Sequence, residues 1–187
     1  YRLRREDRAF HVGVLLENVP DYIFLLGGAA MAGATIVGIN PTRRGAELAA
    51  DIRSVDCDLI ITDDSQLHLL SGLDTGVEEG RIFSIDSAAW QQELEAAAAT
   101  GSTGAPKAVI CSTGRLASLS AINHLSFTRS DVTYNSMPLF HGNAIFSCWG
   151  PSVFTGATFS MRRKFSASGF LPDVLKFGAT YVNYVGR

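Results

Sequence analysis

Residues 11–39 read HVGVLLENVPDYIFLLGGAAMAGATIVGI, in which two short apolar runs flank a longer apolar stretch. The first run, residues 11–16, predicts a buried strand, and residues 35–39 predict a second one. Residues 21–32 predict a helix, with Pro20 near its start, where a missing amide hydrogen costs nothing. A strand, a helix and a strand in succession are typical of an α/β domain.

The rest of the chain continues this alternation. Further strands are predicted at residues 59–62, 81–85, 107–111, 131–137, 157–161 and 180–184, and further helices at 46–55, 88–99, 116–124, 146–154 and 168–176. The sequence contains no internal repeat, heptad array or low-complexity linker. We therefore expect the α/β class and, as the simplest organisation, a single α/β unit.

Composition excludes several classes of protein. The chain has 187 residues, 47% of them hydrophobic, which suits one domain or a large piece of one. A net charge of −2 provides no overall electrostatic footprint for nucleic acid, so we expect no nucleic-acid partner. Three widely spaced cysteines, Cys57, Cys111 and Cys148, fit neither a disulfide framework nor a metal motif. They predict buried thiols in a reducing cytoplasm.

The sequence disfavours a membrane span and leaves peripheral association as the one form of membrane contact to consider. Four glycines interrupt the apolar residues 22–39, which end at Asn40-Pro41, and this favours a helix followed by a strand over a membrane span. No signal peptide precedes the first strand, so we expect a cytoplasmic protein. Residues 1–8 carry four arginines beside one Asp and one Glu. They predict a solvated end, and peripheral association with lipid headgroups is the alternative.

The segment Thr100-Gly101-Ser102-Thr103-Gly104-Ala105-Pro106-Lys107 has the composition to wrap phosphate oxygens. Its glycines let backbone amides turn toward an anion, its hydroxyls are donors, and Lys107 is one of three lysines in the chain. An ordinary solvent loop has similar composition. The segment is not a Walker A loop, because Pro106 precedes the lysine and a predicted strand follows. Its phosphate donors would therefore be its own amides, hydroxyls and lysine, without a helix dipole.

The run from Gly101 to Lys107 resembles the signature loop of the adenylate-forming superfamily, which includes acyl-CoA synthetases, luciferases and peptide-synthetase adenylation domains. This resemblance implies that residues 100–107 bind ATP. Ser102, Thr103 and Gly104 would hold its β- and γ-phosphates, and Lys107 would offset their charge during catalysis. Ala108 is similar to the very-long-chain and fatty-acid-transport-type branch of fatty acyl-CoA synthetases.

A second match is Met137-Pro138-Leu139-Phe140-His141-Gly142-Asn143, which is similar to the aromatic-histidine motif of the same family. The resemblance implies that His141 lies near the reacting carboxylate and the α-phosphate. Phe140 would shape the acyl entrance, and Gly142 would belong to the same substrate site. Considered without the resemblance, a lone histidine is more often a structural residue.

Residues 164–168 and 177–186 resemble the same branch, so that the likeness extends from residue 11 to residue 187. It implies that Tyr184 and Gly186 approach the acyl pocket. The residues alone leave Tyr181 and Tyr184 equally well explained as core residues at a strand end.

The resemblance implies the N-terminal subdomains of the acyl-CoA synthetase fold, with mixed or parallel sheets flanked by helices. Residues 1–187 would be part of the large AMP-binding domain, without its C-terminal part and without the mobile C-terminal domain. The whole enzyme would use ATP and Mg²⁺ to convert a long-chain fatty acid to acyl-AMP and pyrophosphate, and coenzyme A to form acyl-CoA. The 187 residues alone would be inactive, and they contain no metal-ligand spacing of their own.

Two other functions and the oligomeric state remain open. One alternative is a fatty acyl-AMP ligase that delivers the acyl group to a carrier protein. The other is a non-catalytic module that binds acyl chains or a partner.

Residues 88–99 conflict locally with this family. Their Ala, Glu and Gln content predicts a helix, whereas the family's phosphate loop joins two strands. Natural sequences seldom break consistency beside their most recognisable motif. We therefore hypothesise that residues are missing between about residue 96 and residue 101.

Overall fold

The computed structural model describes residues 8–99 and 127–185, which belong to two compact units. Unit 1 comprises Tyr1–Ile110 and unit 2 comprises Cys111–Arg187. Each unit has its own sheet, and no sheet of the described residues joins strands of both. The expectation of a single α/β unit was therefore wrong.

Unit 1 contains strands β1 (Phe10–Leu15), β2 (Ala34–Gly38), β3 (Leu59–Thr62) and β4 (Ile82–Ser84). Its helices are α1 (Pro20–Ala32), α2 (Gly45–Ser54), α3 (Asp64–Leu67) and α4 (Ala88–Ala99), with 3-10 turns η1 (His68–Leu70) and η2 (Glu79–Arg81). The strands are parallel in the order β2-β1-β3-β4. All predicted strands and helices of residues 11–99 are confirmed, whereas the short α3 was not predicted.

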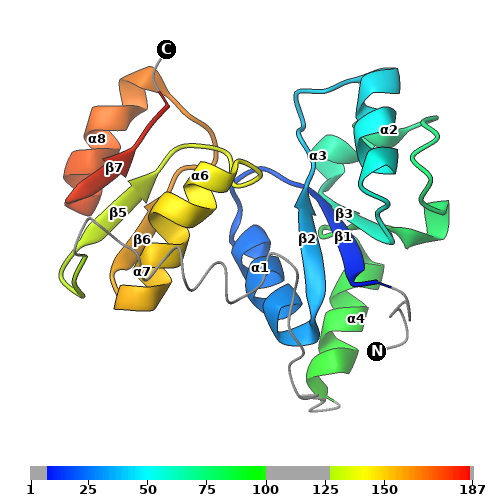
Figure 1. The fold of residues 1–187 in the computed structure, drawn as a ribbon, viewed down its shortest axis with the longest axis horizontal. Coiled ribbons are helices and arrows are strands. Elements are labelled where there is room, and N and C mark those ends of the chain that lie inside the picture. The colour runs from blue at the N-terminus through cyan, green and yellow to red at the C-terminus, as the bar shows by residue number, and fades with distance from the viewer. Residues whose placement is uncertain (1–7, 100–126, 186–187) are drawn as a thin grey trace. The chain divides into compact units, whose positions relative to one another are not determined.

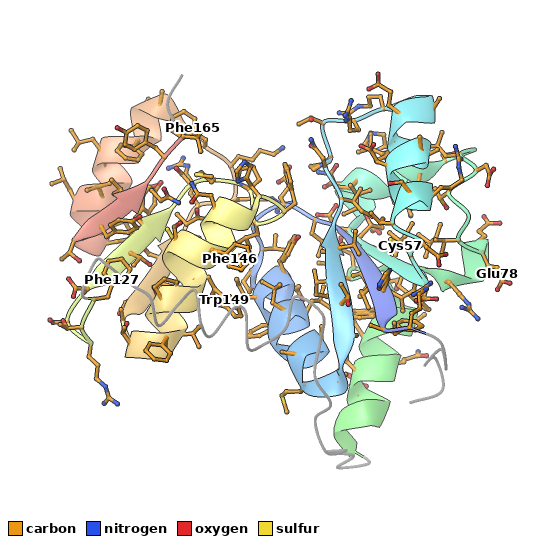
Figure 2. All side chains as sticks on the ribbon, in the orientation of Figure 1. Cys57, Glu78, Phe127, Phe146, Trp149 and Phe165 are labelled. Atoms are coloured by element: carbon orange, nitrogen blue, oxygen red, sulfur yellow. The ribbon has the colours of Figure 1, made fainter. Side chains whose placement is uncertain are left out.

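Both faces of the central strands of unit 1 are covered. Leu15 and Ile60 pack with Leu48 and Ile52 of α2 in the main core, which also contains Cys57 (Figure 2). The neighbouring residues Val14 and Leu15, whose side chains point to opposite faces of β1, are both fully buried, and α1 packs against the edge strand β2 (Figure 1). Strands that are buried on both faces read as continuous apolar runs, which is why residues 11–16 carry a clear signal.

Gly13 of β1 lies where the core has no room for a side chain. A Cβ at this position would be 3.0 Å from the Cys57 sulfur and 3.3 Å from the Leu59 carbonyl oxygen. We expect Gly13→Ala to lower the free energy of unfolding by about 2 kcal/mol, as overpacking does. The measurement is urea denaturation of the chain. Gly28→Ala is the control, because no described atom other than those of its chain neighbours and its own helix backbone lies within 4 Å of a Cβ built there. A Gly13→Ala variant as stable as Gly28→Ala would contradict the packing argument.

Arg8, which precedes β1, forms ion pairs with the turn before β3. Its guanidinium donates to both carboxylate oxygens of Asp58, at 2.7 and 3.1 Å, and to Asp56 at 3.0 Å. Asp58 also accepts from the His11 amide at 2.7 Å. Arg8 is therefore an ion-paired residue, so the prediction of a solvated end was wrong for this arginine.

Unit 2 contains strands β5 (Val132–Asn135), β6 (Thr158–Met161) and β7 (Tyr181–Asn183), which are parallel in the order β6-β5-β7. Its helices are α6 (Gly142–Ala144), the π-helical turn η3 (Ile145–Trp149), α7 (Gly150–Thr155) and α8 (Ala167–Phe177). The predicted strands and helices of residues 131–184 are confirmed, but the first helix begins four residues earlier than predicted, at Gly142. The predicted strand 107–111 and helix 116–124 lie outside the described residues.

The strand order of unit 2 repeats that of the first three strands of unit 1, with the first strand in the middle. The α7 and α8 helices cover opposite faces of the unit 2 sheet (Figure 1). The chain therefore passes from β5 to β6 on one side of β5, and then crosses to β7 on the other side of β5. The strand order reverses between β5 and β7, and open α/β sheets bind ligands at the carboxyl ends of the strands at such a point.

A polar cluster lies beneath α8. The buried Tyr134 donates to the Asp173 carboxylate at 2.9 Å, and Arg162 pairs with the same carboxylate at 2.6 Å. These contacts, that with Arg162 first, hold the pKa of Asp173 below its ordinary value. Burial, followed by the Asp173 contact, raises the pKa of Tyr134 to about 12. The cluster thus joins β5, the end of β6 and α8.

Candidate functional site

The turn after β5 carries the predicted histidine motif. The side chain of Asn135 braces it, because its amide donates to the Met137 carbonyl at 2.8 Å and its oxygen accepts from the Met137 amide at 3.3 Å. The His141 amide then donates to the Pro138 carbonyl at 3.0 Å and closes the turn. Leu139 points inward and is buried. The turn is therefore fixed at its base by hydrogen bonds and by an apolar anchor.

His141 is the N-cap of α6. Its Nδ1 accepts a hydrogen bond from the Asn143 amide at 3.3 Å, while the residue remains exposed. A ring nitrogen that accepts a hydrogen bond carries no proton, so the proton of the neutral imidazole lies on Nε2. His141 can therefore donate from Nε2 to an anion such as a carboxylate or phosphate oxygen.

Gly142 and Phe140 flank this histidine. A Cβ on Gly142 would lie 3.4 Å from the Phe146 ring, so the ring already occupies the space beside the glycine. Phe146 and Trp149, both labelled in Figure 2, belong to η3. Phe140 is half-buried at the end of the turn. The residues that flank His141 in the chain are thus apolar, and π-helical turns of this kind occur frequently at functional sites.

The end of β7 meets the histidine segment through two asparagines. The side-chain amide of Asn183 donates to the backbone carbonyl of Asn143 at 3.3 Å. The side-chain amide of Asn143 donates to the side-chain oxygen of Asn183 at 3.4 Å. Tyr184 follows Asn183 directly and is 75% exposed. It is therefore not a core residue in unit 2, whereas Tyr181 is half-buried against Phe127, with ring centroids 4.9 Å apart. Unit 2 thus brings the His141 segment and the strand end before Tyr184 together.

Other predicted site residues lie outside the described part of the chain. They are Thr100, Gly101, Ser102, Thr103, Gly104, Ala105, Pro106, Lys107 and Gly186. Their roles remain predictions. Asn183 and Ser147 were not predicted as site residues. The one signal in the sequence is that Asn183 is a polar residue at the end of an apolar strand.

The described cysteines are buried thiols, as predicted. Burial raises the pKa of Cys57 to about 11 and that of Cys148 to about 12, so neither is a thiolate near neutral pH. Cys111 lies outside the described residues. Within residues 8–99 and 127–185, no group of three or more His, Cys, Asp or Glu side chains could hold a metal ion. No helix in these ranges has the length and apolar character of a membrane span.

The sequence profile of the AMP-binding enzyme family matches residues 3–187. The chain therefore belongs to this family of adenylate-forming enzymes, and its two units are N-terminal parts of that fold. This confirms the family resemblance described above.

The chain is similar to known ligases. It is 50% identical to the steroid-22-oyl-CoA synthetase of Rhodococcus jostii (strain RHA1), over 98% of this chain and 37% of that protein. It is 39% identical to the medium/long-chain-fatty-acid–CoA ligase FadD17 of Mycobacterium marinum (strain ATCC BAA-535 / M), over 95% of this chain and 38% of that protein. It is 28% identical to human long-chain fatty acid transport protein 1, over 94% of this chain. The chain thus spans less than two fifths of the length of these relatives.

A solved structure confirms the fold. The long-chain-fatty-acid-CoA ligase FadD1 of Archaeoglobus fulgidus superposes with a TM-score of 0.74 at 17% identity, over 94% of this chain and 39% of that one. At this identity the likeness concerns the fold alone.

The relatives also contain residues that this chain lacks. The match to the steroid synthetase spans 205 aligned positions, although the whole chain has only 187 residues. This agrees with the hypothesis of missing residues but does not locate them. Helix α4 extends to Ala99, and residues 100 and 101 lie outside the described part of the chain. The hypothesis stays a prediction.

Proposed function

We propose that the full-length protein carrying this chain is an ATP-dependent, AMP-forming ligase that joins a large apolar carboxylic acid to coenzyme A. The acid carboxylate attacks the α-phosphorus of ATP, and pyrophosphate leaves. The coenzyme A thiol then attacks the acyl carbonyl, and AMP leaves. The first step brings two anions together and needs fixed donors around them.

The observation that carries this proposal is the placement of His141. It lies at the carboxyl edge of a parallel sheet, exposed, with Nδ1 used by the Asn143 amide and Nε2 left as a donor. In the proposed reaction Nε2 donates to an oxygen of the acid or of the α-phosphate. Phe140, Gly142, Tyr184 and Gly186 line the entrance of the acyl chain.

ATP and magnesium belong to the proposal through the family. Residues 100–107 would bind the ATP phosphates, with Lys107 offsetting their charge. Magnesium would supply charge neutralisation on ATP oxygens, and the described residues contain no cluster that would hold it without ATP. The 187 residues alone are proposed to be inactive.

Two classes of acid are candidates. A long-chain fatty acid is supported by relatives of 39% identity named as medium/long-chain-fatty-acid–CoA ligases. A steroid carboxylate is supported by the 50% identity to a steroid-22-oyl-CoA synthetase, and this higher identity favours it. The test measures pyrophosphate release and thioester formation by the full-length protein with palmitate and with a steroid 22-oic acid. The proposal fails if neither acid stimulates pyrophosphate release.

The acceptor is tested in the same assay. Thioester that forms only when coenzyme A is added supports the CoA ligase. Acyl-AMP that accumulates despite coenzyme A supports the alternative, an acyl-AMP ligase that uses a carrier protein. Binding of acid without pyrophosphate release supports a non-catalytic module.

Replacement of His141 by alanine should impair use of the acid more than use of ATP. We expect kcat/KM for the acid to fall by about 10-fold, the cost of losing one hydrogen bond to a charged group. The KM for ATP should change by less than about twofold, because residues 100–107 are proposed to hold the β- and γ-phosphates. Equal losses for both substrates, together with a lower melting temperature, would instead make His141 a structural residue.

A further inference from the structure

We infer that Asn183 is a positioning residue for His141, which it orients through Asn143. The inference rests on the proposed function for its effect on catalysis, but its structural part can be tested separately. Asn183 is not one of the residues that the family resemblance assigns to the site.

The side chain of Asn183 is placed to hold another residue and not to meet solvent. It is only 8% exposed at the end of β7. Its two polar atoms form the reciprocal pair of hydrogen bonds with Asn143 at 3.3 and 3.4 Å. Because one of these bonds is to the Asn143 backbone carbonyl, Asn183 restrains the main chain of that residue as well as its side chain.

Asn143 has its remaining polar groups engaged as well. Its side-chain oxygen accepts from the Ser147 hydroxyl at 2.6 Å. Its backbone amide donates to His141 Nδ1 at 3.3 Å. Asn143 is therefore held by Asn183 of β7 and by Ser147 of η3, and these contacts fix the direction of its backbone amide. That amide selects the His141 tautomer with the proton on Nε2.

The hydrogen bonds between Asn143 and Asn183 join the ends of β5 and β7, which flank the predicted substrate site. His141 follows β5, whereas Asn183 ends β7, and these strands are neighbours in the sheet. Removal of the Asn183 side chain leaves His141 in place but frees Asn143 to shift. The imidazole can then populate the other tautomer, with Nε2 unprotonated and unable to donate.

The structural test uses the full-length protein. Nitrogen-15 NMR of labelled histidine distinguishes the two neutral tautomers, and His141→Ala identifies the His141 signal among those of the other histidines. We expect one tautomer, with the proton on Nε2, in the unmodified chain, and a mixture in Asn183→Ala. A mixture in the unmodified chain, or an unchanged single tautomer in Asn183→Ala, would overturn the inference.

The kinetic test uses the full-length protein. Asn183→Ala should lower kcat/KM for the acid by about 3- to 10-fold and leave the KM for ATP within about twofold. Ser160→Ala is the control, since Ser160 is as buried and its hydroxyl bonds the Thr133 carbonyl, not the His141 segment. In the double variant His141→Ala/Asn183→Ala, the loss should equal that of His141→Ala alone.

The kinetic outcomes separate the inference from the proposed function. Additive losses in the double variant, or an Asn183→Ala variant as active as Ser160→Ala, overturn the inference while the ligase activity stands. A full-length protein that releases no pyrophosphate with any acid overturns the proposed function, and the NMR experiment then decides the positioning role.

Discussion

Lys107→Ala in the full-length protein is expected to slow acid-dependent pyrophosphate release by about 10- to 1000-fold, the range for loss of one charge-stabilising donor. The physical reason is that the first half-reaction gathers the charges of a carboxylate and of ATP, and a lysine is a mobile cation that can follow them. A lysine in a glycine-rich loop contributes little to packing. The melting temperature should therefore change by less than about 2 °C.

The control for this prediction removes the same charge elsewhere. Lys176→Ala alters a lysine at the end of α8, where the ammonium lies 5.4 Å from the Phe177 ring centroid. Its rate should stay within about twofold of that of the unmodified protein, because no phosphate contact is proposed for Lys176. A Lys107→Ala variant with an unchanged rate would remove Lys107 from the ATP site.

Asp58→Asn is expected to lower the free energy of unfolding of unit 1 by about 3 kcal/mol, as expected when a buried ion pair is broken. The Asp58 side chain is 4% exposed and receives three hydrogen bonds, two from Arg8 and one from the His11 amide. An asparagine offers one oxygen and turns its own amide donor toward one of these donors. The replacement therefore removes the charge and leaves at least one buried donor without a partner.

Asp56→Asn is the matched control, because this carboxylate pairs with the same Arg8 but is 66% exposed. Asparagine also tolerates the positive φ of 48° at this position. We expect a change of less than about 1 kcal/mol, as for a surface ion pair. Urea denaturation compares the two variants. Equal losses of stability would mean that burial of Asp58 does not decide its contribution.

Sequence patterns predicted the elements of this fold well but not their grouping. Strand 59–62 was predicted with its observed bounds, and the helix over residues 88–99 is confirmed as α4. Such elements can be predicted because the pattern of apolar residues and the residue composition are properties of a short stretch of sequence. The division into two units depends on which strands pair, and pairing joins residues far apart in the chain. The early start of the helix after His141 was also missed, because Gly142 and Asn143 are weak helix formers that the His141 cap supports.

The amino-acid sequence alone determined the family, the alternation of strands and helices, and the choice of His141 as a candidate, because motif residues and periodicity are local properties. Only the tertiary structure decided that His141 holds its Nδ1 toward a backbone amide and that Asn183 meets Asn143 across two strand ends. It also decided that Tyr184 is exposed and that Arg8 is paired with Asp58. The Asn143–Asn183 and Arg8–Asp58 contacts join residues 40 and 50 positions apart. Such contacts follow from the order of strands in a sheet, which no local pattern specifies.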